Sequence, residues 1–189
     1  MADTHIVVLQ GSPHHKGNTA ALVEHLTDTA RAAGATVEVF HLHGMNISPC
    51  TGCEGCHKEG ADGCVIDDRM NEIYPKLLAA DDIVFASCIY FFTVSAQLKA
   101  ALDRCYALVS LGGEPPLAGK RVGLVLTYGA PDFVQSGGAD VEKMFRKTCS
   151  FNNMDFAGVA HGSAGQGGIR DNNEAMDAAA DLGRNLAMG

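Results

Sequence analysis

Four of the seven cysteines stand close together at the spacing C-x2-C-x2-C-x7-C, namely Cys50, Cys53, Cys56 and Cys64. Thiolates ligate iron–sulfur clusters and zinc, and they also exchange electrons by reversible pairing. A [4Fe–4S] cluster needs four thiolates, and the closely spaced triplet is the arrangement that bacterial ferredoxins use. The glycines between these cysteines leave the backbone free to curl around a cluster. The spacing therefore favours a [4Fe–4S] cluster.

Two other interpretations of this segment stay open. A structural zinc accepts four thiolates, but zinc sites usually have two separated C-x2-C pairs, and the sequence offers only part of that pattern. The segment could also be a loop of free or reversibly paired thiols without metal. Glu54 and His57 lie inside the segment, and we predict that both are solvated because four thiolates complete a cluster without them.

Composition limits the class of protein. A length of 189 residues predicts a single domain over 1–189, interrupted by a cysteine-rich insert at 49–66. The formal charge of −8 argues against nucleic acid and anionic membrane surfaces as partners, because both need a basic patch. Neither a signal peptide nor an apolar stretch of about 20 residues is apparent, which predicts a cytoplasmic protein with small molecules or proteins as partners.

Apolar runs alternate with helical patterns along the chain. Strands are predicted at 5–10, 36–42, 82–87, 121–127 and 154–161. Helices are predicted from Asn18 to Gly34, after Asp67 or Asp68, and at 95–109, 141–149 and 172–188, with Pro75 either kinking the second helix or starting a new turn. This alternation predicts an α/β flavodoxin-like three-layer sandwich with a five-stranded parallel sheet in the order 2-1-3-4-5.

Ligands of such sheets bind outside the carboxyl ends of the strands, which indicates the loops 11–18, 88–93 and 127–132. The first loop matches neither the P-loop nor the G-x-G-x-x-G dinucleotide pattern. It does place Ser12, Asn18 and Thr19 at a helix N-terminus, with Lys16 and His14 alongside. Such an arrangement suits one phosphate monoester, while the alternative is an ordinary turn in which Asn18 caps the helix.

Three motifs in order resemble the NADPH-dependent FMN reductase family and, within it, the iron-sulfur flavoproteins. They are Gly-Ser-Pro-x-x-x-Gly-Asn-Thr at 11–19, Cys-Val-Ile-Asp-Asp-x-Met at 64–70, and Ile-Tyr-Phe at 89–91 followed by Ser-x-Gln-Leu-Lys-x-x-x-Asp-Arg at 95–104. The resemblance implies that FMN binds with its phosphate on Ser12, Asn18 and Thr19. It also implies that the isoalloxazine lies against two loop segments, Ile89, Tyr90 and Phe91 in one and Thr127, Tyr128 and Gly129 in the other.

The chain departs from the family pattern at two positions. His14 stands where the family usually has Arg or Lys, so phosphate affinity is expected to depend on pH. Cys88 stands where the family typically has proline. It could face the flavin, but we predict that it packs as a small apolar side chain. Asp103 and Arg104 are predicted to form a structural ion pair near a helix end.

The resemblance implies an FMN-dependent oxidoreductase that takes electrons from NAD(P)H or ferredoxin and passes them to a small acceptor such as oxygen, a quinone or free flavin. It also implies a homo-oligomer, a dimer or tetramer, with the cysteine loop beside a flavin. No side chain is predicted to act as a catalytic acid or base, because the cofactors carry the chemistry. A flavodoxin-like electron carrier and a redox sensor that uses the cysteine loop are the alternatives.

Overall fold

The computed structural model describes residues 4–165 and 167–189. Its parallel sheet has the order β2-β1-β3-β5-β6, formed by β1 (His5–Gln10), β2 (Thr36–His41), β3 (Asp82–Tyr90), β5 (Arg121–Tyr128) and β6 (Asp155–Ser163). Counting only these parallel strands, the order is 2-1-3-4-5. The predicted flavodoxin-like fold is therefore confirmed.

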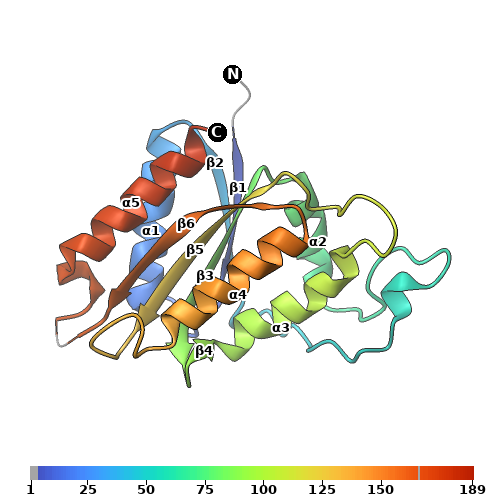
Figure 1. Cartoon of the computed structure of the whole chain (residues 1–189), viewed down its shortest axis with the longest axis horizontal. Helices are drawn as coiled ribbons and strands as arrows, with labels where there is room; N and C mark the ends of the chain where they lie inside the picture. The colour runs from blue at the N-terminus through green and yellow to red at the C-terminus, as the bar shows by residue number, and fades with distance from the viewer. Residues whose placement is uncertain (1–3, 166) are drawn as a thin grey trace.

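Helices cover both faces of the sheet and make three layers (Figure 1). The face with α1 (Asn18–Ala32) and α5 (Asn173–Ala187) buries Ile6 and Val8 of β1. The opposite face, with α2 (Met70–Ala79), α3 (Ala96–Arg104) and α4 (Gly138–Phe151), buries Val7 and Leu9. Both faces of β1 are thus apolar, which is why its sequence is a continuous apolar run.

Differences from the predicted helices are local. Helix α2 continues through Pro75, so this proline neither ends the helix nor starts a new one. The helix predicted at 95–109 consists of α3 and a 3-10 turn, η2 (Cys105–Leu108). Two further 3-10 turns are η1 (Gly55–His57) in the cysteine loop and η3 (Ile169–Asp171) before α5. No helix among the described residues combines the length and apolar character that crossing a bilayer requires.

The prediction of five strands misses β4 (Thr93–Val94), which pairs antiparallel with the end of β3. The two strands are joined by Phe91 and Phe92, whose φ angles are 50° and 67°. Two-residue hairpin turns usually place Asn or Gly at such angles, so the sequence lacks the usual hairpin signal. The left-handed conformation costs about 1–2 kcal/mol for each residue with a Cβ. The surrounding contacts must offset this strain.

Candidate functional site

A cavity of about 160 Å³ lies at the carboxyl ends of β1, β3 and β5, where the fold places ligands. Its lining includes all the predicted cofactor residues except Lys16 and Phe91, namely Ser12, His14, Asn18, Thr19, Ile89, Tyr90, Thr127, Tyr128 and Gly129. Cys88 and Ala164 complete the lining. Three loops that are far apart in the sequence therefore meet at one cavity.

The N-terminus of α1 forms one wall of this cavity and has features that suit an anion. The residue before the helix is Gly17, which has no side chain for capping, and the first turn contains no acidic residue. The prediction that Asn18 caps the helix is wrong, because its Oδ1 accepts the Ile169 N–H at 3.1 Å. The first-turn N–H groups therefore have no capping side chain, and phosphate is a suitable acceptor for them.

Buried hydroxyl groups lie next to this helix end. Ser12 is 4% exposed and Thr19 is 1% exposed. The Thr19 and Thr127 hydroxyl oxygens are 2.7 Å apart and share a hydrogen bond, which ties the first turn of α1 to the end of β5. The residues present thus fit the phosphate end of FMN, with hydroxyls and backbone N–H groups on one side of the cavity.

A second cavity of about 210 Å³ adjoins the first and shares Ile89, Tyr128 and Gly129 with it. Phe91 lines this second cavity with Phe92, and the Phe91 side chain is 95% exposed. The structure therefore places Phe91 at the mouth of the site rather than inside the first cavity.

Lys16 lies outside both of these cavities. It lines a separate cavity between α1 and β2, together with Arg31 and Arg170. The structure therefore does not bring Lys16 together with the other predicted phosphate contacts.

Two lining residues were not among the predicted cofactor contacts: Cys88, which lies in the predicted ligand loop 88–93 but was expected to pack as a small apolar side chain, and Ala164. Cys88 is partly exposed and lies in the cavity wall, and the neighbouring Cys88 thiol is the main cause that raises the pKa of Tyr90. Ala164 follows the carboxyl end of β6, so the rule for ligand loops would have included it if applied to every strand.

Tyr128 is anchored by a second group of side chains behind the cavity. Its hydroxyl oxygen lies 3.0 Å from His161 Nδ1. The His161 ring stacks on Phe133, with centroids 3.8 Å apart and planes 6° from parallel. His161 therefore connects β6 to both Tyr128 and the loop that follows β5, which lines the second cavity.

We predict that His161 makes stability depend on pH. Burial lowers the pKa of His161, partly opposed by Glu142 and Glu174. The unfolded chain then binds the proton more readily, so stability should fall as the pH drops below about 6.5. In His161→Gln, urea unfolding between about pH 7.5 and 5 should give a flatter stability curve than in the wild type. The exposed His43→Gln is the control and should keep the wild-type slope, and an unchanged slope in His161→Gln would contradict this origin.

The cysteine loop projects beyond the end of α3, on the side of the molecule away from α1 and α5 (Figure 1). Cys50 and Cys53 are exposed, whereas Cys56 and Cys64 are partly buried. Among the residues that the structure describes, no three His, Cys, Asp or Glu side chains are close enough together to bind a metal ion. The four predicted ligands therefore share one loop, but their thiols are not gathered.

The donor chemistry of this loop nevertheless suits a four-thiolate group. The Gly52 N–H donates to Cys50 Sγ at 3.4 Å, and the Gly55 N–H is the main cause that lowers the pKa of Cys53. Backbone N–H groups directed at sulfur are the usual support for cluster thiolates. Gly52 and Gly63 have φ angles of 64° and 101°, which residues with a Cβ rarely adopt.

Glu54 is exposed, as predicted, whereas His57 is partly buried, and both contact Tyr106. The Tyr106 hydroxyl donates to Glu54 Oε2 at 3.0 Å, and His57 Nε2 lies 3.0 Å from the Tyr106 carbonyl oxygen. The His57 and Tyr106 rings also meet edge to face, with centroids 4.6 Å apart. These contacts fix the middle of the cysteine loop to η2.

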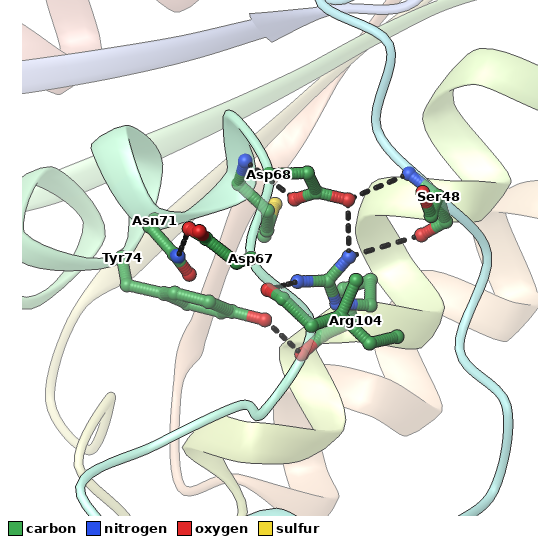
Figure 2. A network of polar contacts seen from close by, with 8 residues as sticks. Ser48, Asp67, Asp68, Asn71, Tyr74 and Arg104 are labelled. Carbon is green, nitrogen blue, oxygen red and sulfur yellow. Dashed lines mark hydrogen bonds and ion pairs between the residues drawn. The ribbon is translucent and has the colours of Figure 1, made fainter.

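The predicted pairing of Asp103 with Arg104 is also wrong. Arg104 Nη1 donates to Asp68 Oδ2 at 2.8 Å (Figure 2), whereas Asp103 accepts from Lys99 Nζ at 2.6 Å. Neighbours along a helix point in different directions, so adjacent opposite charges do not face each other. The partner of Arg104 is 36 residues away in the sequence.

Comparison with known proteins identifies the family. The NADPH-dependent FMN reductase family model matches residues 4–179. An iron-sulfur flavoprotein of Archaeoglobus fulgidus is 42% identical over 107 residues, which cover 56% of this chain and 52% of that protein. The chain spans about half the length of the curated relatives it matches.

Solved structures show the same fold at lower identity. The NAD(P)H:quinone oxidoreductase from Methanothermobacter marburgensis has a TM-score of 0.72 at 20% identity, covering 98% of this chain and 96% of that one. An FMN-dependent NADH-azoreductase from Bacillus anthracis, in complex with FMN, has a TM-score of 0.68 at 14% identity, covering 98% of each chain. Because the family model matches most of its length, the chain belongs to the NADPH-dependent FMN reductase family.

Proposed function

We propose that the chain is a single flavodoxin-like FMN-binding domain that acts as an NAD(P)H-dependent oxidoreductase. The observation that carries this proposal is the cavity at the carboxyl ends of β1, β3 and β5, where an uncapped helix N-terminus meets buried hydroxyls. The family match and the FMN named in related proteins support it.

The residues have separate tasks in this proposal. Ser12, Thr19 and the first-turn N–H groups of α1 hold the phosphate, and Asn18 ties the loop before α5 to this wall. Ile89 and Tyr128 line both cavities and orient the ring along them. When bound, FMN accepts two electrons from NAD(P)H and releases them singly or in pairs. The protein supplies position and an accessible ring edge rather than an acid or base.

We further propose that Cys50, Cys53, Cys56 and Cys64 hold a [4Fe–4S] cluster, with ferredoxin as a second possible electron donor. The support is the four-thiolate donor set, the N–H groups directed at sulfur, and the names of the iron-sulfur flavoproteins among the relatives. Binding requires the loop to bring its four thiols together. An oxygen, quinone or flavin acceptor is compatible with the open second cavity.

The exposed aromatic turn supports a homo-oligomer. Phe91 and Phe92 are 95% and 67% exposed, and Tyr90 beside them is 47% exposed. An apolar cluster at the mouth of a ligand cavity is typical of a surface that another molecule covers. We propose that a second copy of the chain covers it, and light scattering of Phe91→Ser/Phe92→Ser should then show a smaller assembly than the wild type.

The test of the proposed function is an anaerobic visible spectrum of the purified protein, with FMN, iron and sulfide measured on the same sample. We expect about one FMN per chain, and oxidation of NADPH or NADH when a quinone is added. A flavin spectrum without iron would remove the cluster and leave the FMN site standing. A colourless protein that takes up no added FMN would overturn both.

A further inference from the structure

The cysteine loop begins after Ser48 and ends before Ile66, and these two ends form its neck. One buried guanidinium bridges them. Arg104, at the end of α3, is 1% exposed. Its Nη1 donates to the carbonyl oxygen of Ser48, which precedes the four cysteines, at 3.1 Å (Figure 2). Its Nη2 donates to the carbonyl oxygen of Ile66, which follows them, at 3.1 Å. One side chain therefore joins the chain segment before the four cysteines to the chain segment after them.

Asp68 completes this closure from the other side. Its Oδ2 accepts from Arg104 Nη1 and from the Ser48 N–H, both at 2.8 Å, and its Oδ1 accepts from the Met70 N–H at 2.9 Å. Tyr74 adds a contact, because its hydroxyl donates to the Arg104 carbonyl oxygen at 3.0 Å. The two ends of the neck and the start of α2 are thus all hydrogen-bonded to the ion pair of Arg104 and Asp68 (Figure 2).

Burial and neighbouring side chains shift the pKa values of Tyr74 and Arg104 in this network. The pKa of Tyr74 is raised mainly by burial, with the Cys64 thiol among the smaller causes. Burial alone would lower the pKa of Arg104, but Asp68 and, more weakly, Tyr74 and Cys64 raise it. Arg104 Nε is buried and has no hydrogen-bond partner among the described residues. Arg104 therefore keeps one buried N–H group without a partner beside the bonds that close the loop.

The opposite end of α3 is bonded to the cavity loop. Ser95 precedes the helix, and its hydroxyl donates to the Gly11 carbonyl oxygen at 2.7 Å while accepting the Leu98 N–H at 3.3 Å. Its own N–H donates to the Ser87 hydroxyl of β3 at 2.8 Å. Helix α3, about 14 Å long at 1.5 Å per residue, therefore links the cavity loop to the neck of the cysteine loop.

We propose that Arg104 and Asp68 are positioning residues that lock the cysteine loop to α3 and so fix its location relative to the flavin cavity. Bonds to two carbonyl oxygens and one carboxylate require the planar fork of arginine, which lysine cannot replace. Without the lock, the hydrogen bonds of Glu54 and His57 to Tyr106 would still hold the middle of the loop, but its two ends would separate far more often. The role in cluster binding rests on the proposed function, but the role in closing the loop does not.

The experiment compares tryptic cleavage after Lys58, an exposed residue inside the loop, in the full-length protein. We expect Arg104→Lys to be cleaved there at least about tenfold faster than the wild type, because cleavage follows the population of the open loop. The matched control is Arg121→Lys, which breaks the pair between the partly buried Arg121 and the buried Asp82 (both N···O contacts 2.7 Å) at the amino ends of β5 and β3. Its cleavage rate after Lys58 should stay within about twofold of the wild type.

A second variant separates positioning from simple charge balance. The double variant Asp68→Asn/Arg104→Met leaves no unpaired buried charge, so it should recover much of the global stability lost in Arg104→Met. It still lacks the Arg104 bonds to the carbonyl oxygens of Ser48 and Ile66, so its cleavage after Lys58 should stay fast. Wild-type cleavage rates in Arg104→Lys or in the double variant would overturn the proposal.

Iron content and the electron paramagnetic resonance signal of the proposed cluster test the same lock independently of cleavage. In protein reconstituted with iron and sulfide, Arg104→Lys should lower the ratio of iron to FMN. The electron paramagnetic resonance signal of the remaining reduced cluster should shift, because the loop that carries its four ligands is no longer held at both ends. Iron that is absent from the wild type as well would refute the proposed cluster, while the cleavage result would still decide the lock.

Discussion

Gly11→Ala is expected to lower the free energy of unfolding by about 1–3 kcal/mol and to weaken FMN binding by at least about tenfold. Gly11 begins the loop that forms the phosphate side of the cavity. A Cβ at this position would lie 2.6 Å from the Leu98 Cβ and 2.8 Å from the Ser95 hydroxyl oxygen. Neither atom can move without moving α3, because Leu98 lies in the helix and Ser95 caps it.

The direction of this effect follows from comparing two magnitudes. Replacing glycine by alanine usually stabilises a protein by about 0.4–1 kcal/mol, because the unfolded chain loses freedom. The free-energy cost of the steric overlap at Gly11 exceeds this gain, because the overlap also disrupts the hydrogen bond from Ser95 to the Gly11 carbonyl oxygen. Urea unfolding measures the stability, and fluorescence quenching of added FMN measures the affinity.

Gly129→Ala is the matched control for the steric argument. Gly129 lines the same cavity, but a Cβ there would have no atom within 4 Å. Its free energy of unfolding should therefore stay within about 0.5 kcal/mol of the wild-type value. Equal destabilisation by Gly129→Ala and Gly11→Ala would show that the contact with α3 is not the cause.

Local patterns predicted the parallel sheet because the strands are buried on both faces. The run at 5–10 is apolar at successive positions, and both core clusters contain residues from it. The same logic placed the cavity, since parallel strands bring their carboxyl ends to one edge. Residues 12, 19, 89 and 127 could thus be assigned to one site without any contact between them being known.

Side-chain partners far apart in the sequence could not be predicted in this way. Arg104 is adjacent to Asp103 in the chain, but only the packing of α3 against the loop at 66–68 shows that its partner is Asp68. The contacts of Tyr106 with Glu54 and His57 have the same origin. Asn18 was expected at a cap, yet the tertiary contact with Ile169 takes its side-chain oxygen.

The β3–β4 hairpin was missed for a different reason. Its turn consists of Phe91 and Phe92, and local propensity gives no reason to place two phenylalanines in the left-handed region. The strain is sustained by the neighbouring loop, because Gly137 packs against the backbone of Phe92 so closely that a Cβ there would lie 2.6 Å from the Phe92 carbonyl oxygen. Strained segments often occur beside functional sites, and this one borders the second cavity.

Replacing any one of the four loop cysteines by serine is expected to remove most of the bound iron while FMN stays bound. A [4Fe–4S] cluster needs a thiolate at each iron, so the loss of one ligand should reduce cluster occupancy by about tenfold or more. FMN should be retained because the flavin cavity is lined by none of these cysteines. Iron, zinc, sulfide and FMN measured on the same anaerobically purified samples give the result.

Two other cysteines make this experiment selective. Cys149 is a buried residue of α4, and Cys149→Ala tests whether general destabilisation releases iron. We expect this variant to keep the wild-type ratio of iron to FMN. Cys88 lies in the wall of the flavin cavity, so Cys88→Ser should alter FMN affinity while leaving iron bound. Zinc in place of iron in the wild type would favour a structural metal. Iron loss in Cys149→Ala equal to that in the loop variants would show that the cysteines at 50–64 are not its ligands.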